Sequence, residues 1–127
     1  MLGPTGESGS LPGVIDQIKQ AEALGLNNVW MANIFSFDAI STLGLAARET
    51  STIELGTAVT PTYPRHPTAL AQQALTTAAA SEGRFVLGIG LSHKIVIEGM
   101  LGLSYEQPAK HMREYLNVLM PLVRGES

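Results

Sequence analysis

Short apolar segments alternate with amphipathic segments along the whole chain, and this alternation constrains the fold more than any other feature. Val14, Ile18 and Ala21 recur at the spacing of one helix face, and later segments repeat that spacing. The expected strands are residues 28–32, 53–59 and 85–89, with residues 1–4 as the end of an earlier strand. Because most connections are short, the strands should run parallel, and the sequence predicts an α/β fold.

Residues typical of helix ends mark where the intervening helices begin and end. The expected helix starts are Ser10, Asp38, Pro67 and Ser104. Ser104, with Gln107 three residues later, resembles a capping box. Gly25 should end the first helix, and Pro121 should end or kink the last one, because proline removes a backbone donor.

The composition is that of a globular domain with an apolar core. Of 127 residues, 45% are hydrophobic and 15% are charged. The net charge of -3, without any basic run, argues against nucleic acid and anionic membranes as partners. No apolar run approaches the roughly 20 residues that span a bilayer, and no signal-peptide pattern is present. We therefore expect a cytoplasmic protein.

Cysteine and histidine usage excludes or disfavours several kinds of site. The chain has no cysteine, which excludes disulfides, thiolate zinc sites and a cysteine nucleophile. His66, His93 and His111 fall in different segments and lack the spacing of metal ligands, so we expect no metal site.

The stretch from Glu82 to His93 concentrates the features of a functional site. Its expected strand ends at Gly88 and Gly90, where the missing side chains let a backbone or a flat ligand come close. Relief of crowded packing is the alternative explanation of these glycines. Ser92 and His93 follow at the carboxyl end of the strand, where parallel α/β folds build their sites. His93 is the candidate catalytic residue, because an imidazole can give and take a proton, with capping of the connection as its structural alternative.

Other polar and aromatic residues also have a functional and a structural interpretation. Asn33 either hydrogen-bonds a ligand carbonyl or serves a turn. Arg65 either holds an anionic group or pairs with an acidic residue. His66 is expected to fix its loop by hydrogen bonds. His111 is expected at the surface of the last helix, and Trp30 is expected in the core.

Several motifs together resemble the bacterial luciferase-like monooxygenases. They are Ile53-Glu54-Leu55-Gly56-Thr57-Ala58-Val59-Thr60, Arg65-His66-Pro67 and Glu82-Gly83-Arg84-Phe85-Val86-Leu87-Gly88-Ile89-Gly90. Their order and spacing are similar to the branch of the family that uses the deazaflavin coenzyme F420 in place of FMN. The resemblance implies a (β/α)8 TIM barrel, of which residues 1–127 match the first βα units, a half-barrel. The chain is therefore expected to be the N-terminal part of a single barrel domain.

The resemblance also implies which residues contact the coenzyme. Family members have a non-proline cis peptide bond behind the flavin ring, and the matching bond is Ala58–Val59 or its neighbour. The edge of the ring is contacted from the segment after the fourth strand. The residues expected to bind the coenzyme are Asn33, Ala58, Val59, Gly90, Leu91 and Ser92.

The sequence departs from some deazaflavin enzymes at the positions that handle the substrate proton. Those enzymes have a histidine after the second strand and a glutamate after the fourth. This sequence has Ile34 and His93 in the matching places. The resemblance therefore does not support sugar-phosphate specificity and leaves the substrate open.

Together these observations predict a flavin- or deazaflavin-dependent oxidoreductase or monooxygenase acting on a small organic substrate at the carboxyl face of the barrel. F420 is the expected coenzyme, and FMN is the alternative. Another (β/α)-barrel enzyme, such as a phosphosugar enzyme, is one alternative function. A non-catalytic half-barrel that self-associates is another, because open strand edges recruit further chains. We expect a homo-oligomer.

Overall fold

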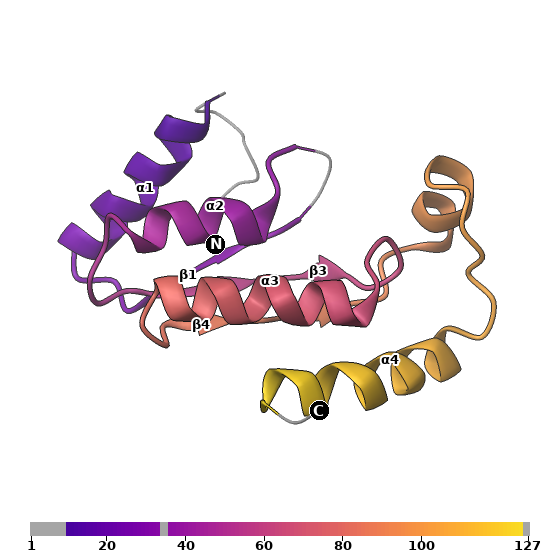
Figure 1. Cartoon of the computed structure of the whole chain (residues 1–127). Helices are drawn as coiled ribbons and strands as arrows, with labels where there is room; N and C mark the ends of the chain where they lie inside the picture. The colour runs from indigo at the N-terminus through magenta and orange to yellow at the C-terminus, as the bar shows by residue number, and fades with distance from the viewer. Residues whose placement is uncertain (1–9, 34–35, 126–127) are drawn as a thin grey trace.

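The computed structural model describes residues 10–33 and 36–125 as an ordered succession of helices and strands (Figure 1). The helices are α1 (Leu11–Ala23), α2 (Ala39–Ala47), α3 (Pro67–Ala80), the π-helix η1 (Ile95–Met100) and α4 (Pro108–Val123). The strands are β1 (Asn28–Met31), β2 (Glu54–Thr57), β3 (Thr60–Pro61), β4 (Phe85–Val86) and β5 (Ile89–Gly90). The strand expected at residues 1–4 lies outside the described residues, as does Ile34.

All the strand pairs of the described residues are parallel, helices α1 to α4 pack over them, and η1 lies apart at the strand ends. The strand order is β1-β2-β4 in one sheet and β3-β5 in the other. α1 packs on α2, α2 on α3, and α3 on α4, so the helices follow the order of the strands (Figure 1). Val29, Met31 and Leu55 are buried in the core beneath this layer. The predicted α/β fold with parallel strands is confirmed.

The expected third and fourth strands are each interrupted, and the interruptions face each other. The first falls at Ala58–Val59, whose peptide bond is cis, as the family resemblance implied. The second falls between Val86 and Ile89. At the gap, the Thr57 hydroxyl donates a hydrogen bond to the Gly88 carbonyl oxygen at 2.8 Å and accepts one from the Gly88 N–H at 2.9 Å. This side chain therefore replaces backbone ladder bonds between the two strands.

Residues 85–89, an apolar run typical of a buried strand, are only half-buried in the structure. Phe85, Leu87 and Ile89 pack partly against a core cluster formed by α2, α3 and α4. Within the part of the chain that the structure describes, β4 pairs with β2 alone and forms the edge of the sheet. An edge strand leaves one side of its apolar residues uncovered.

Most of the expected helix ends are confirmed. The Ser10 hydroxyl accepts a hydrogen bond from the Gly13 N–H at 3.1 Å at the start of α1. Asp38 accepts one from the Ser41 N–H at 2.9 Å and caps α2. Gly25, with φ of +86°, follows α1 in the left-handed conformation that glycine tolerates. α3 begins at Pro67 as predicted.

The predicted start of the last helix is wrong, and Pro121 does not end that helix. α4 begins at Pro108, because a proline disfavours helical geometry in the residue before it, and Gln107 has a φ of +50° and makes no capping bond. The Ser104 hydroxyl instead accepts a hydrogen bond from the Glu106 N–H at 3.3 Å. At the other end, α4 passes through Pro121 to Val123, whose side chain still packs against the core.

Arg84 ties the ends of two helices to the sheet. Its guanidinium donates hydrogen bonds to the carbonyl oxygens of Ala47 at 2.9 Å, Ile53 at 2.9 Å and Thr50 at 3.2 Å. It also donates to the Thr50 hydroxyl at 3.0 Å and to the Ser81 carbonyl oxygen at 2.8 Å. Helix ends leave carbonyl groups without intrahelical partners, and this one side chain satisfies the last carbonyl of α2, at Ala47, and the carbonyl of Ser81 just after α3.

Glu22 at the end of α1 anchors the loop that leads into β2. One of its carboxylate oxygens accepts backbone hydrogen bonds from Thr52 at 2.8 Å, Ser51 at 2.9 Å and Ile53 at 3.0 Å. These bonds lower the pKa of Glu22 to about 2, against an ordinary value of 4.5. The charged carboxylate therefore stabilises the fold at neutral pH.

Glu22→Gln is expected to remove an acid-sensitive part of the stability. Because the folded pKa lies below the ordinary value, the stabilisation is complete above about pH 4.5 and is lost as the pH falls towards 2. Urea denaturation at several pH values should show a steeper loss between pH 5 and pH 2 in the parent than in the variant. Glu106→Gln, at an exposed position, is the control and should follow the parent. Parallel curves for the parent and Glu22→Gln would contradict this assignment.

Within residues 10–33 and 36–125, no helix combines the length and the apolar character needed to cross a membrane.

Candidate functional site

A pocket of about 420 Å³ lies where β1, β3 and β5 end. We call it the strand-end pocket, and its lining residues are Asn33, Pro61, Pro64, Arg65, Ser92, His93, Val96, Ile97 and Leu101. Parallel strands bring their carboxyl ends to one edge, so residues distant in sequence meet there. The structure thus brings together Asn33, Ser92 and His93, which the sequence singled out.

Asn33 performs the turn role that was its structural interpretation, and it also lines the pocket. Its side-chain oxygen accepts a hydrogen bond from the Ala39 N–H at 2.8 Å, at the start of α2. Its backbone N–H donates to the Val59 carbonyl oxygen at 3.3 Å. The first bond fixes the orientation of the amide, so the side-chain nitrogen is the group left for another partner.

Arg65 pairs with an acidic residue, as one of its two interpretations predicted. Its guanidinium forms a partly buried ion pair with Asp38. Burial alone would raise the pKa of Asp38, but hydrogen bonds from Ser41 and the charge of Arg65 outweigh it and lower that pKa. The Tyr115 hydroxyl donates a hydrogen bond to the Arg65 carbonyl oxygen at 2.8 Å, so α4 fixes the loop between β3 and α3 that carries Arg65.

His111, which was expected at the surface of the last helix, is half-buried. Its ring stacks on Tyr63, with ring centres 3.8 Å apart and planes 10° apart. Its Nε2 is 2.8 Å from the Thr62 hydroxyl. Burial lowers the pKa of His111, although the nearby Glu114 carboxylate acts in the opposite direction. The packing of α4 against the loop after β3 was not visible in the local sequence.

His93 and His66 lie at the loops around the pocket. His93 is exposed at the rim, directly after Ser92, whose φ is +61°. The Tyr105 hydroxyl donates to the Ser92 carbonyl oxygen at 3.2 Å and so fixes the chain just before His93. His66 caps α3, because its Nδ1 accepts a hydrogen bond from the Thr68 N–H at 3.1 Å, and its predicted loop role is confirmed.

An apolar surface beside the pocket is formed by Ala58, Val59 and Gly90, and we call it the Val59 platform. A Cβ atom on Gly90 would lie 2.5 Å from Val59 Cγ2, so only glycine leaves room for the valine. Thr60 and Thr62 are buried towards the helices, and alternation therefore places Val59 on the opposite, open face. The Val59 side chain is 41% exposed there. Leu91, the next residue after Gly90, is half-buried.

Trp30 also lies on the open face, so the prediction that it lies in the core is wrong. The neighbouring Val29 and Met31 take the core positions, so strand alternation turns Trp30 away from the helices. Its ring covers Gly56, where a Cβ atom would lie 2.3 Å from the indole. The indole N–H donates to the Asn28 side chain at 3.0 Å.

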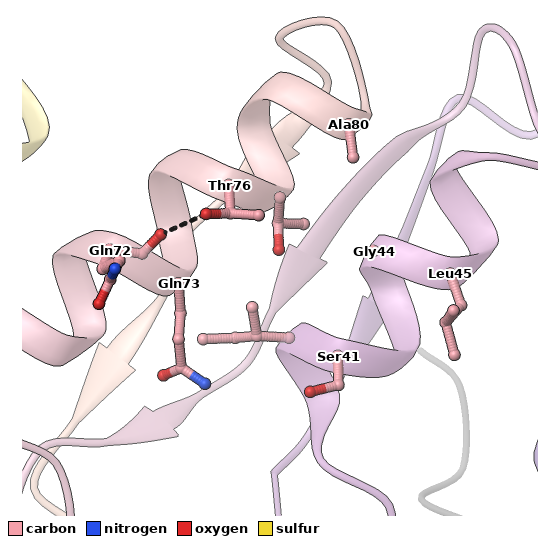
Figure 2. A pocket seen from close by; sticks show the side chains of 9 residues that line it. Ser41, Gly44, Leu45, Gln72, Gln73, Thr76 and Ala80 are labelled. Atoms are coloured by element: carbon pink, nitrogen blue, oxygen red, sulfur yellow. Dashed lines mark hydrogen bonds between the residues drawn. The ribbon is translucent and has the colours of Figure 1, made fainter.

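A second pocket, of about 480 Å³, lies between α2 and α3 on the helical layer (Figure 2). Figure 2 shows Ser41 and Gly44 on α2 facing Gln73 on α3 across this groove. All of its lining side chains are uncharged. The strand-end pocket is therefore the better candidate for chemistry, since it combines a histidine, an arginine and an amide.

The sequence did not reveal the apolar wall of the strand-end pocket. Val96, Ile97 and Leu101 come from η1 and the residue after it. The sequence feature that could have indicated this wall is the apolar-rich stretch between Lys94 and Leu103, which lacks the hydrophobic repeat of an α-helix. A π-helix shifts that repeat, and such segments are frequent at functional sites.

Comparison with known proteins identifies relatives of the same architecture. The chain is 34% identical over 111 residues to a 5,10-methylenetetrahydromethanopterin reductase of Archaeoglobus fulgidus, covering 87% of this chain and 33% of that one. The structure of the coenzyme F420 dependent tetrahydromethanopterin reductase from Methanopyrus kandleri matches 88% of this chain and 36% of that chain, with 28% identity and a TM-score of 0.76.

A third match shows the fold alone. The oxygenating constituent of 3,6-diketocamphane monooxygenase from Pseudomonas putida, in complex with FMN, matches with a TM-score of 0.74 and 22% identity. It aligns with 83% of this chain and 32% of that chain. The chain thus spans about a third of the length of each of these proteins.

The match to a family model agrees with these relatives and with the motifs in the sequence. The model described as luciferase-like monooxygenase matches residues 2–127, which is almost the whole chain. The parallel strands, the cis bond at Ala58–Val59 and the glycines after β4 lie within the matched residues. The chain belongs to the luciferase-like monooxygenase family.

Proposed function

We propose that the chain forms the first βα units of a (β/α)8 barrel oxidoreductase that binds coenzyme F420. The observation that carries this proposal is the Val59 platform beside a pocket lined by hydrogen-bonding groups. Its exposed apolar surface suits the flat face of a deazaflavin ring. Relatives named as F420-dependent or tetrahydromethanopterin reductases support F420, and FMN is the alternative coenzyme.

The residues have distinct roles in this proposal. Ala58, Val59 and Gly90 would back the ring, and Leu91 with Ser92 would hold its edge. Asn33 would hydrogen-bond a ligand oxygen through its side-chain nitrogen. A bound deazaflavin supplies or accepts a hydride, and the protein contributes shape, hydrogen bonds and a proton.

We assign the proton transfer to His93. It is exposed at the rim of the strand-end pocket, where a small organic substrate would enter. An imidazole can both give and take a proton, which suits His93 to this role during turnover.

The test uses an assembled barrel, because the chain matches only a third of each relative's length. Residues 1–127 are joined to the rest of the Archaeoglobus fulgidus reductase, and F420 binding is followed by its fluorescence. Gly90→Val should weaken F420 binding about tenfold, because the larger side chain displaces Val59 from the platform. Unchanged affinity in a folded variant would contradict the platform assignment.

His93→Gln is the matched variant in the same assembled barrel. It should leave F420 affinity near that of the parent and lower turnover about 100-fold, since it removes a positioned acid-base group. The reverse pattern, with affinity lost and turnover per bound coenzyme kept, would move His93 from proton transfer to coenzyme binding.

Self-association of the chain is also part of the proposal. An apolar groove of about 370 Å³ lies between α3, β4 and α4, lined by Phe85, Leu87 and Leu116 among others. Together with the open edge of β4, it favours contact with a second copy. Light scattering during size exclusion checks this, and a monomer at all concentrations would contradict it.

A further inference from the structure

The short segment that follows β5 is held by few hydrogen bonds. At its two ends, the Gly90 carbonyl oxygen accepts from the loop after β3, and the His93 carbonyl oxygen accepts from η1. Between these points, the described part of the chain gives Leu91 and Ser92 a single hydrogen bond. It runs from the Tyr105 hydroxyl to the Ser92 carbonyl oxygen at 3.2 Å. The position of this segment therefore depends on one side chain.

The backbone of Ser92 needs such a contact because it is strained. Its φ of +61° lies in the left-handed region, which is unfavourable for a residue with a side chain. A conformation of this kind persists only where the surrounding structure holds it. The Tyr105 hydroxyl contacts the strained residue itself, at its carbonyl oxygen. Loss of this bond should let Ser92 leave the left-handed region.

The same hydrogen bond closes the base of the loop that carries η1. Ser92 and Tyr105 are 13 residues apart, and η1 lies between them, clear of the other helices (Figure 1). The Tyr105 N–H also donates to the Glu98 carboxylate at 3.3 Å, within the same loop. His93 lies inside this loop, as does the apolar wall of the strand-end pocket. One hydroxyl thus sets where the whole loop begins and ends.

The ring of Tyr105 is itself held by other aromatic rings, which we call the aromatic row. Its centre lies 5.0 Å from that of Tyr63, which stacks on His111, and the His111 ring lies 5.6 Å from that of Tyr115. His111 and Tyr115 belong to α4, so the row connects Tyr105 to a helix packed on the core. The Tyr63 hydroxyl oxygen is buried and has no hydrogen-bond partner among the described residues. Tyr63 therefore contributes its ring and not its hydroxyl.

We propose that Tyr105 is a positioning residue for the coenzyme edge and for His93. The aromatic row fixes the Tyr105 ring, and the Tyr105 hydroxyl keeps Ser92 in the left-handed conformation. Ser92 in turn sets the direction of the chain at the edge of the Val59 platform and the place of His93 at the pocket rim. The inference rests on the proposed function for the roles of Ser92 and His93, but the order of Ser92 can be measured without any coenzyme.

Tyr105→Phe tests the hydroxyl, because phenylalanine keeps the ring in the aromatic row. Backbone order parameters are measured by 15N relaxation on the labelled 127-residue chain. Those of Ser92 and His93 should fall from about 0.85, typical of rigid backbone, towards about 0.6, while those of α3 and α4 keep the parent values. The unchanged helices show that the variant is folded. An order parameter of Ser92 equal to that of the parent would overturn the inference.

Two changes at Tyr63 separate the ring from the hydroxyl. Tyr63→Phe removes a hydroxyl without a partner and keeps the ring, so Ser92 should stay as ordered as in the parent. Tyr63→Leu removes the ring beside Tyr105 and should loosen Ser92 in part. If Tyr63→Phe loosens Ser92 as much as Tyr105→Phe does, the bond to Ser92 is not what holds the segment, and the inference is wrong.

The consequence for the coenzyme is measured in the assembled barrel described above, by the fluorescence of F420. Tyr105→Phe should weaken F420 binding about fivefold, because binding must then order a segment that the parent already holds in place. Glu106→Gln, at the next and exposed position, should keep the parent affinity. Equal affinities for the parent and Tyr105→Phe would show that Tyr105 does not position the coenzyme edge.

Failure of this inference can be distinguished from failure of the proposed function. If Ser92 loosens in Tyr105→Phe alone of the two phenylalanine variants but the parent barrel binds neither F420 nor FMN, the proposed function is wrong and Tyr105 still positions the rim of the pocket. If the barrel binds F420 and Tyr105→Phe changes neither affinity nor the order of Ser92, the proposed function stands and the positioning role is refuted.

Discussion

Gly88→Ala is expected to destabilise the fold by about 3 kcal/mol or to prevent folding, because it forces backbone apart at the junction of the two strand pairs. A Cβ atom on Gly88 would lie 2.1 Å from the Thr57 carbonyl oxygen. That atom is backbone, so no side-chain rotation relieves the overlap. Separation would also break the paired hydrogen bonds between the Thr57 hydroxyl and Gly88. Urea denaturation measures the loss.

Gly99→Ala is the matched control for this prediction. Nothing lies within 4 Å of a Cβ atom at Gly99, which is in η1. Its effect should stay within about 0.5 kcal/mol, the usual range for surface substitutions. If both variants unfold at the same urea concentration as the parent, the close approach at Gly88 does not limit stability.

Arg84→Met is expected to cost about 3 kcal/mol of unfolding free energy, because it leaves the carbonyl groups of Ala47, Thr50, Ile53 and Ser81 without their charged donor. Methionine keeps much of the apolar stem and provides no N–H group. The variant should also increase hydrogen exchange at the end of α2 and at the entry to β2, since Ala47 and Ile53 share this donor. Denaturation and exchange can be measured on the same sample.

Arg48→Met and Arg84→Lys separate charge from geometry. Arg48 is exposed one residue after α2, so its replacement should have little effect. Lysine at position 84 keeps the charge but not the planar fork, and it should recover only a minor part of the lost stability. Full recovery by Arg84→Lys would show that charge alone matters there.

Local sequence was sufficient for the features that depend on neighbours in the chain. Ser10, Asp38 and Pro67 mark helix starts because capping acts over a few residues. Pro108 also acts locally, by excluding its predecessor from the helix, and this effect determines the start of α4 rather than the Ser104 pattern. The parallel sheet followed from the order of the segments.

The periodicity of the sequence could not predict features that depend on contacts between residues far apart in the chain. The breaks in the third and fourth strands depend on Thr57 meeting Gly88, 31 residues away, and the cis bond came only from the family resemblance. Strand-end reasoning selected Asn33, Ser92 and His93 for the site. It did not find the stacking of His111 beside Thr62, 49 residues away, since that contact depends on how α4 docks.

The position of Trp30 gives the molecule a built-in optical probe. It is the single tryptophan of the chain, and its ring lies over Gly56 on the face that the helices leave open. Emission excited at the indole band therefore reports on that face and not on the core. Quenching or a shift of this emission should accompany closure of the barrel interior by added strands, without any label. The tryptophan emission can thus follow assembly of the barrel interior, while tyrosine emission reports on a different region. The tyrosines are Tyr115 in α4 and Tyr63 and Tyr105 near it.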